Sequence, residues 1–165
     1  MASSPNAVVL RGGCLCEALS YCSTSLPDEL THCHCVTCRK ISGAPFITWS
    51  EFPLSDFSWT SSKPSALRAT WRSNVAERGH CVDCGSTMYM KYEAYPTIIF
   101  VAAGTIDEKS VEGNLPKRRL HIYAGKGKKA AWFDLPDDGI PRRDAMGPEF
   151  RRGIDEWEQG KRRSP

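Results

Sequence analysis

The sequence predicts an all-β fold, a single compact domain of short antiparallel strands with minor helical turns. Three observations support this prediction. Short runs of alternating or β-branched residues recur along the first hundred positions, turn residues separate these runs, and seven of the eight cysteines fall into three short clusters. A chain of 165 residues is long enough to bury one core. Because the apolar residues do not recur at a spacing of three or four positions, strands are favoured over helices.

The expected strands follow one another along the chain. Residues 7–10 form the first strand, and residues 18–22 alternate in a way typical of its hairpin partner. Further strands are expected at 45–49, 57–60, 67–72, 87–92 and 97–103, and the last of these is apolar throughout, as in a strand covered on both faces. Helical turns are expected only at 37–41 and around 148–158.

The cysteine spacing indicates two metal sites. Cys14 and Cys16 form a C-x-C pair, while Cys81 and Cys84 form a C-x-x-C pair; the remaining cluster, C-x-C-x-x-C, consists of Cys33, Cys35 and Cys38. A structural zinc is held by four ligands, whereas a catalytic zinc keeps three protein ligands and one open position. Seven ligands divide naturally into four plus three, which favours an enzyme. Spacing alone does not decide which cysteines share a metal.

Glycines flank two of the clusters, at 12–13 and at 85, and we expect them to bend the backbone so that amide groups face the sulfur atoms. Disulfides are the alternative use of eight cysteines. They are disfavoured because the N-terminus carries no signal-peptide pattern, and a cytoplasmic location is therefore expected.

Composition narrows the choice of partners. No apolar run approaches the roughly 20 residues that span a bilayer, so no membrane partner is expected. The net charge is +3, and the basic residues of the C-terminal third are interrupted by acidic ones. This pattern is typical of a solvated surface and does not favour nucleic acid. A small-molecule substrate is expected, while the oligomeric state is left open.

Beyond these patterns, the ordered motifs resemble a known family. They are Gly13-Cys14-Leu15-Cys16, the segment from Cys33 to Lys40, Cys81-Val82-Asp83-Cys84-Gly85, Gly104-Thr105-Ile106-Asp107, His121-Ile122-Tyr123 and Ala131-Trp132. Together they resemble the GFA family, named for glutathione-dependent formaldehyde-activating enzyme, which includes centromere protein V. The resemblance covers roughly residues 10–135. It implies a GFA-type zinc-binding domain over 1–135, followed by a C-terminal extension, 136–165, that packs on it and ends in a frayed basic tail.

The same resemblance implies two Zn²⁺ ions per chain and divides the cysteines between them. Cys14, Cys16, Cys81 and Cys84 would close a structural site, and Cys33, Cys35 and Cys38 would hold an open, catalytic-type zinc. Three thiolates make zinc a soft centre that suits an incoming thiol. The predicted function is therefore that of a zinc-dependent carbon–sulfur lyase acting on a thiol adduct of an aldehyde, with a glutathione-like thiol. The catalytic residues are expected to be the three open-site cysteines and His34.

Two other functions remain open. In the first, the same site acts on a bulkier organic substrate as a lyase, dehydratase or cyclase. Its aromatic pocket would be formed by Phe46, Trp49, Trp59 and Trp71 if these residues lie near the second cluster, but packing in the core is the favoured interpretation for all four. In the second, the domain is a non-catalytic zinc-binding module. The leftover thiol, Cys22, is expected to be a small buried hydrophobe on a strand.

Overall fold

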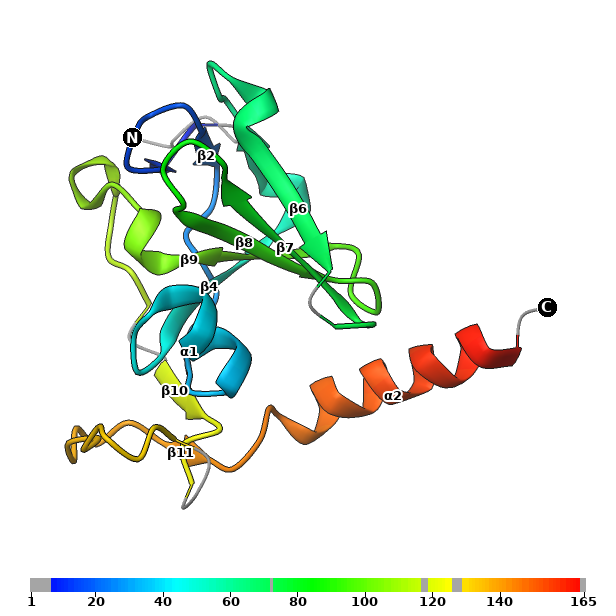
Figure 1. The fold of residues 1–165 in the computed structure, drawn as a ribbon. Coiled ribbons are helices and arrows are strands. Elements are labelled where there is room, and N and C mark those ends of the chain that lie inside the picture. The colour runs from blue at the N-terminus through cyan, green and yellow to red at the C-terminus, as the bar shows by residue number, and fades with distance from the viewer. Residues whose placement is uncertain (1–6, 72, 117–118, 126–128, 164–165) are drawn as a thin grey trace.

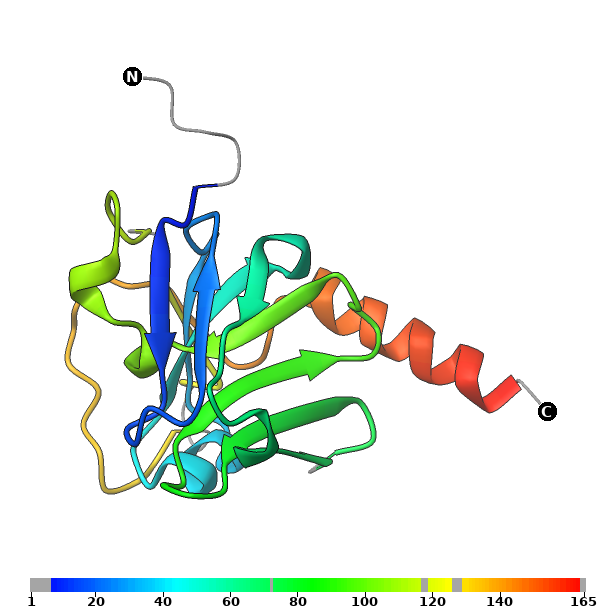
Figure 2. The same ribbon diagram turned by 90° about the horizontal axis from the view of Figure 1, so that it is seen from above.

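The computed structural model describes residues 7–71, 73–116, 119–125 and 129–163, and it has a mainly β architecture (Figures 1 and 2). A three-stranded sheet has the order β1-β2-β5, and an eight-stranded sheet has the order β11-β10-β3-β4-β9-β8-β7-β6. The small sheet contains β1 (Leu10–Gly13), β2 (Ser20–Ser23) and β5 (Phe57–Trp59). The strands of the large sheet are β3 (Leu30–Cys33), β4 (Ile47–Pro53), β6 (Leu67–Trp71), β7 (Ala76–Cys81), β8 (Thr87–Tyr92), β9 (Ile98–Ala102), β10 (Arg119–Ile122) and β11 (Arg142–Arg143).

These sheets confirm the predicted all-β domain with minor helical content. Every expected strand is present: the one at 87–92 has the expected bounds, and the others have shifted ends. The end of the 67–72 prediction, Arg72, lies outside the described residues. Strands β3, β7, β10 and β11 were not expected. Most strand pairs are antiparallel, but β10 runs parallel to both of its neighbours, β3 and β11. The parallel pair of β10 and β3 sets residues 119–122 beside the strand that leads into the second cysteine cluster.

Two α-helices accompany the sheets. The first, α1 (Val36–Ser42), confirms the helical turn expected at 37–41; it begins after Cys35 and ends at Gly43, whose φ of 66° is the left-handed conformation that glycine adopts readily. Four short 3₁₀ turns lie at Leu54–Asp56, Pro64–Ala66, Ala103–Thr105 and Glu108–Ser110.

The second helix, α2 (Pro148–Arg163), is longer than the stretch around 148–158 that the sequence indicated. Ion pairs one turn apart, such as Arg151 with Asp155, support its exposed face. Its first half is anchored because the Phe150 ring stacks on Tyr95 at 4.3 Å between centroids and Ile154 is fully buried. Its second half reaches the loops beside β7 and β8, where Glu158 accepts a hydrogen bond from Asn74 at 2.6 Å and Lys161 pairs with Glu93 at 2.8 Å, while its C-terminal end projects beyond the sheets in both ribbon views (Figures 1 and 2). The division of the chain into 1–135 and 136–165 stays a prediction.

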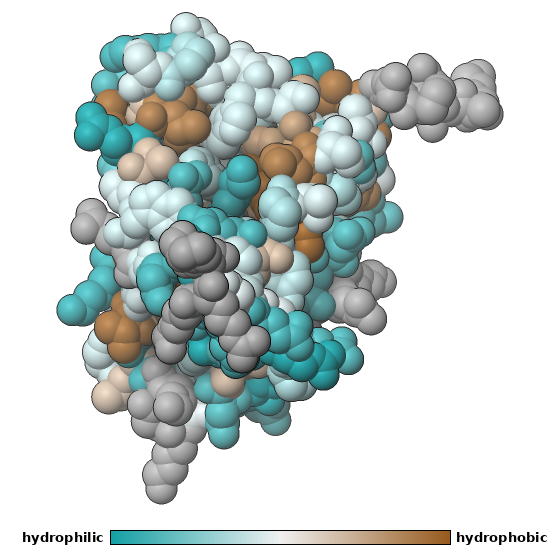
Figure 3. All heavy atoms as spheres, turned by 90° about the vertical axis from the view of Figure 1, so that its right-hand side faces the viewer, coloured by the Kyte–Doolittle hydropathy of each residue, from teal (hydrophilic) through white to brown (hydrophobic). Residues whose placement is uncertain are grey.

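The core consists of two hydrophobic clusters, one beside each group of cysteines. The first includes Leu10, Tyr21, Phe52 and Met88 and reaches Cys14 and Cys81, while the second includes Trp49, Met90 and Phe100 and reaches Cys33 and Cys38. On the face that carries the C-terminal end of α2, apolar side chains form separate patches among hydrophilic ones (Figure 3). In the described part of the chain, no helix is both long enough and apolar enough to cross a membrane.

Candidate metal centres and the adjoining hollow

Four cysteines meet where the β1–β2 connection approaches the turn between β7 and β8. The sulfur atoms of Cys14, Cys16, Cys81 and Cys84 all lie within 4.8 Å of one another. The Sγ atoms of Cys14 and Cys16 are 3.5 Å apart, and those of Cys16 and Cys81 are 3.7 Å apart. Four sulfurs placed about 2.3 Å from a central zinc would be roughly 3.8 Å apart, so this donor set fits a tetrahedral zinc.

Local backbone geometry brings these four sulfurs together. Gly85 has a φ of 78°, and its N–H donates to the carbonyl oxygen of Cys81 at 2.9 Å, which turns the chain between the third and fourth cysteines. Leu19 N–H donates to the Cys14 sulfur at 3.3 Å. The bend expected at Gly12 is wrong, because that residue lies within β1. A Cβ at Gly12 would overlap the Thr105 carbonyl oxygen and the Tyr21 ring, so glycine is needed there for close approach.

The second cluster lies at the junction of β3 and α1. Cys33 ends β3, Cys35 caps the helix, and Cys38 lies in its first turn, with all three sulfurs within 4.8 Å of one another. The Cys38 N–H donates to the Cys35 sulfur at 3.4 Å, and the indole Nε1–H of Trp49 donates to the Cys38 sulfur at 3.5 Å. Within the described residues, no fourth cysteine, histidine or carboxylate joins this group.

Hydrogen bonding prepares one thiolate in each cluster. The thiols of Cys33 and Cys38, together with two backbone N–H groups, lower the pKa of Cys35 well below the ordinary value for a thiol. In the four-cysteine group, the Ser86 hydroxyl lies 3.2 Å from the Cys84 sulfur and lowers the pKa of that thiol to about 6. The pKa is raised for Cys33 and Cys38 in one cluster and for Cys16 and Cys81 in the other, because burial and the neighbouring sulfurs disfavour further charge, so a bound metal would have to displace their protons.

The three-cysteine cluster opens on a hollow of about 770 Å³, whereas the four-cysteine group does not line it. The sheet register explains how the hollow forms. Residues directly opposite in neighbouring strands share a face, and Arg78 pairs with Met90, which pairs with Phe100. Phe100 in turn pairs with Glu51. One face of the large sheet therefore carries the floor of the hollow from β7 to β4.

The far wall of the hollow comes from the C-terminal part of the chain. Met146, Phe150 and Ile154 line it, so α2 covers what would otherwise be an open sheet face. With Trp49, Tyr92, Phe100 and Tyr123, the aromatic ring of Phe150 makes the hollow rich in apolar contacts.

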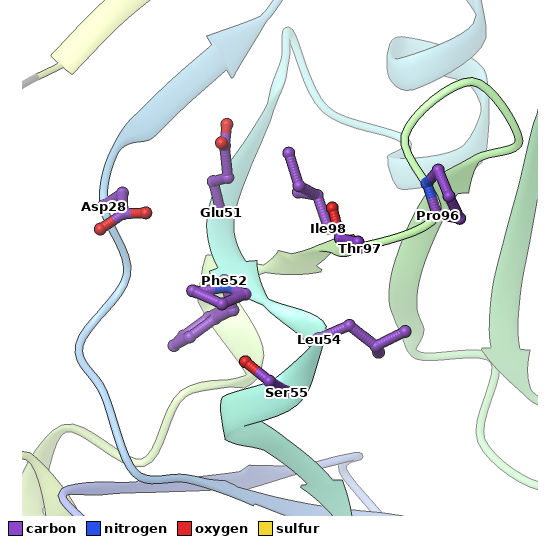
Figure 4. Close-up of a pocket in the computed structure, with 9 residues that line it drawn as sticks. Asp28, Glu51, Phe52, Leu54, Ser55, Pro96, Thr97 and Ile98 are labelled. Atoms are coloured by element: carbon purple, nitrogen blue, oxygen red, sulfur yellow. The ribbon is translucent and has the colours of Figure 1, made fainter.

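Charged residues line the hollow at several places, with carboxylates on the β3–β4 side, Arg78 on β7, and Arg143 and Arg151 on the C-terminal wall. Glu51, on β4, has a pKa raised by burial and by the neighbouring carboxylates of Glu29 and Asp28. Asp28 and Glu51 also line an adjoining pocket of about 550 Å³, where Figure 4 shows the Glu51 side chain leaving β4 and the Asp28 carboxylate facing it from the segment before β3. Arg78 lies on β7, three strands away from Glu51.

The structure places His34 away from the hollow. Side chains alternate in extended backbone, so His34 points to the side opposite Cys33 and Cys35. There its Nε2 lies 2.8 Å from Nδ1 of His121, whose Nε2 lies 3.0 Å from a carboxylate oxygen of Asp138. Burial and the neighbouring His121 lower the pKa of His34 to about 4. Any role of His34 in chemistry at the cysteines is therefore indirect, and residue patterns do not indicate a contact between histidines 87 positions apart.

The four aromatic residues do not share one pocket, and the favoured interpretation, packing in the core, is confirmed for Trp49 and Trp59. Of the four candidates, Trp49 lines the three-cysteine hollow, and Phe46 lines a separate hollow of about 550 Å³ beside His121. Trp59 packs on Tyr21 and Phe57 in the other core cluster, and Trp71 is half exposed on the edge strand β6. Cys22 is half-buried on β2, outside both clusters.

Comparisons with known proteins agree with this arrangement. Residues 9–126 match the family described as glutathione-dependent formaldehyde-activating enzyme. An uncharacterized lyase of Schizosaccharomyces pombe is 35% identical over 87 residues, which are 50% of this chain and 57% of that protein, so the match spans little more than half of the relative. The crystal structure of a Rhodobacter sphaeroides protein superposes with a TM-score of 0.51 at 19% identity, covering 64% of this chain and 97% of that one, and it shows a shared fold.

Proposed function

Since the chain belongs to the family of glutathione-dependent formaldehyde-activating enzymes, we propose that it is a zinc-dependent lyase that forms or breaks the carbon–sulfur bond in a thiol–aldehyde adduct. The observation that carries this proposal is the three-cysteine cluster facing a hollow, with no fourth ligand in the described residues. The family membership and the lyase name of the yeast relative support the reaction class.

The two clusters would hold zinc in different ways. Cys14, Cys16, Cys81 and Cys84 supply four thiolates for a structural ion that ties the first hairpin to the β7–β8 turn. Cys33, Cys35 and Cys38 supply three thiolates and leave one coordination position free, the pattern of a catalytic site. Zinc bound at this second site would provide a Lewis acid that lowers the pKa of a thiol and holds its sulfur near an electrophile.

The protein's own residues would orient the reactants and keep water out. When the thiolate sulfur bonds to the carbonyl carbon, the carbonyl electron pair moves to oxygen, which takes a proton; the reverse reaction returns the thiol and the aldehyde. Glu51 is the candidate proton donor because it lines the hollow and its pKa is raised. Trp49 fixes the Cys38 sulfur, and the aromatic walls bind the organic part of the adduct.

Exchange NMR of formaldehyde with glutathione tests the proposal. The zinc-replete wild type should accelerate exchange, the Cys35→Ser variant should lose this acceleration, and Cys22→Ser should keep it because Cys22 lies outside both clusters. An unaccelerated reaction with two zinc ions bound to the wild type would rule out this substrate pair. Equal acceleration by Cys35→Ser would rule out the open site as the place of reaction.

A second candidate substrate class is favoured by the size of the hollow. A volume of about 770 Å³ lies within the usual range for sites that bind drug-sized ligands and far exceeds the needs of formaldehyde. The same NMR assay with an aromatic aldehyde, such as benzaldehyde, in place of formaldehyde decides between them. A larger acceleration with benzaldehyde would support a bulkier organic substrate, and acceleration with formaldehyde alone would exclude it.

A further inference from the structure

Arg78 is a buried cation with N–H groups that form no hydrogen bond within the described residues. The residue lies in the middle of β7 and is only 9% exposed. Its Nε and Nη1 atoms have no hydrogen-bond partner among the described residues. Burying a guanidinium group without a partner costs free energy, and a buried unsatisfied group in a native fold calls for an explanation. A bound anion would supply the missing acceptor atoms.

The Arg78 side chain faces the hollow that contains the three-cysteine cluster. Its register partner Met90 lines the same hollow, as expected for neighbours on one face of a sheet. Tyr92, which packs against the hydrophobic cluster that contains Cys33 and Cys38, lines the same hollow as Arg78. Arg78 and the three cysteines therefore line one hollow and can contact the same ligand.

Arg78 and the cysteines lie at opposite ends of that space. Strand β7 is separated from β3, which carries Cys33, by β8, β9 and β4, and Figure 1 labels the strands from β7 to β4. Four steps of about 4.8 Å would separate the two strands in a flat sheet, and sheet curvature together with the length of an arginine side chain shortens the gap. A ligand that reaches both ends must be several bonds longer than a one-carbon adduct of a small thiol.

We infer that Arg78 binds a carboxylate at the far end of an elongated thiol substrate whose sulfur lies at the three-cysteine cluster. This inference rests on the proposed thiol chemistry and assigns the substrate class of that site. A guanidinium group suits a carboxylate because its N–H groups can form two parallel, charge-assisted hydrogen bonds. Glu51, Glu29 and Asp28 gather on the β3–β4 side of the hollow, so they do not neutralise Arg78.

The test measures binding rather than turnover. Dissociation constants of glutathione and of its diethyl ester, which lacks both free carboxylates, are measured by calorimetry on the zinc-replete protein. The wild type should bind glutathione at least about tenfold more tightly than the ester, as expected for a charge-assisted hydrogen bond. Arg78→Met should bind both compounds about equally, and Arg78→Lys should keep part of the preference. Arg68→Met, which removes an exposed arginine from the neighbouring strand β6, should behave as the wild type does.

Thermal melts separate ligand binding from a structural role. Because its Nε and Nη1 atoms lack partners, replacing Arg78 by Met should leave the melting temperature of the ligand-free protein unchanged or raise it. Equal wild-type affinities for the two compounds, no binding of either, or a preference retained by Arg78→Met would each overturn the inference. A loss of zinc affinity in Arg78→Met would also overturn the inference. It would mean that the Arg78 cation compensates the negative charge of the cysteine thiolates instead of binding a carboxylate.

The two proposals can fail separately. Ester discrimination without any accelerated exchange would leave the carboxylate site standing and refute the proposed lyase reaction. Accelerated exchange without a preference for glutathione over its ester would support the lyase reaction and refute the carboxylate site.

Discussion

The hydrogen bond from Trp49 to Cys38 gives a sharp test of how the fold tunes the second cluster. Trp49 is only 2% exposed, and its Nε1–H donates to the Cys38 sulfur at 3.5 Å. Trp49→Phe keeps an aromatic ring in the core but removes this donor. Since Trp49 belongs to the hydrophobic cluster beside Cys33 and Cys38, the change is confined to one of the two candidate metal sites.

The expected magnitude follows from the charge on the acceptor. A hydrogen bond to a charged group contributes about 1.5–3 kcal/mol, and the long N···S distance places this one at about the lower end. A loss of about 1.4 kcal/mol corresponds to a tenfold change in affinity. We therefore expect the zinc affinity of the three-cysteine site to fall about tenfold, within the 10- to 100-fold range typical for partners of metal ligands.

Competition with a zinc-chelating indicator, fitted to two sites, measures this change. Trp59→Phe is the matched control, because Trp59 lies in the other core cluster and no hydrogen bond to a sulfur is present for it in the described residues. Only the three-cysteine site should weaken in Trp49→Phe, and neither site should weaken by this route in Trp59→Phe. The reasoning is refuted if the second site is unaffected, or if both sites of Trp49→Phe weaken equally as a general loss of packing would require.

Three further outcomes are expected. Cys84→Ser removes one ligand of the four-cysteine group and should lower the free energy of unfolding by several kcal/mol, on the order of the share of one ligand in a structural zinc site, with denaturant melts of the zinc-replete protein as the measurement. Glu51→Gln should raise the melting temperature at neutral pH. Burial and nearby carboxylates raise the folded-state pKa of Glu51 above 4.5, so its ionisation destabilises the fold as pH rises. The gain should therefore grow as pH rises from about 4.5 through the raised folded-state pKa and level off above it, and a gain that is constant over this interval would contradict this reasoning. Gly79→Ala should cost about 1–3 kcal/mol in urea melts because its Cβ would overlap the Tyr89 ring, whereas Gly104→Ala, with open space around its Cβ, should change little.

The sequence predicted the cysteine clusters well because their information is local. Spacings of two or three residues bring sulfurs together within each short cluster, but the meeting of Cys16 with Cys81, 65 residues further along the chain, was implied only by the family resemblance. The alternating runs likewise predicted most strands. Strand β7 was not predicted because its residues Ala76–Cys81 mix charged and small side chains. Strand β3 was not predicted because Leu30–Cys33 has only one strongly apolar residue.

What could not be predicted depends on register. Arg78 reads in the sequence as a surface residue, and only its pairing with Met90 shows that it faces a hollow. In the sequence His34 is a neighbour of two catalytic-type cysteines, but the side-chain alternation continues one residue past β3 and directs His34 toward His121 instead. Such facts depend on pairings between strands far apart in the chain, which residue patterns do not specify.

Part of the wall of the hollow lies outside the segment that matches the family, so the substrate cannot be inferred from relatives alone. The family match ends at residue 126 and contains all seven clustered cysteines, whereas Met146, Phe150 and Ile154 come after it and form one wall of the same hollow. The chemistry at the cysteines can therefore be common to the family while the shape of the ligand space is set by a segment that the match does not include. A lyase 35% identical over half of this chain supports the reaction class for that reason, and the substrate must be sought from residues such as Arg78 and Phe150 in this protein itself.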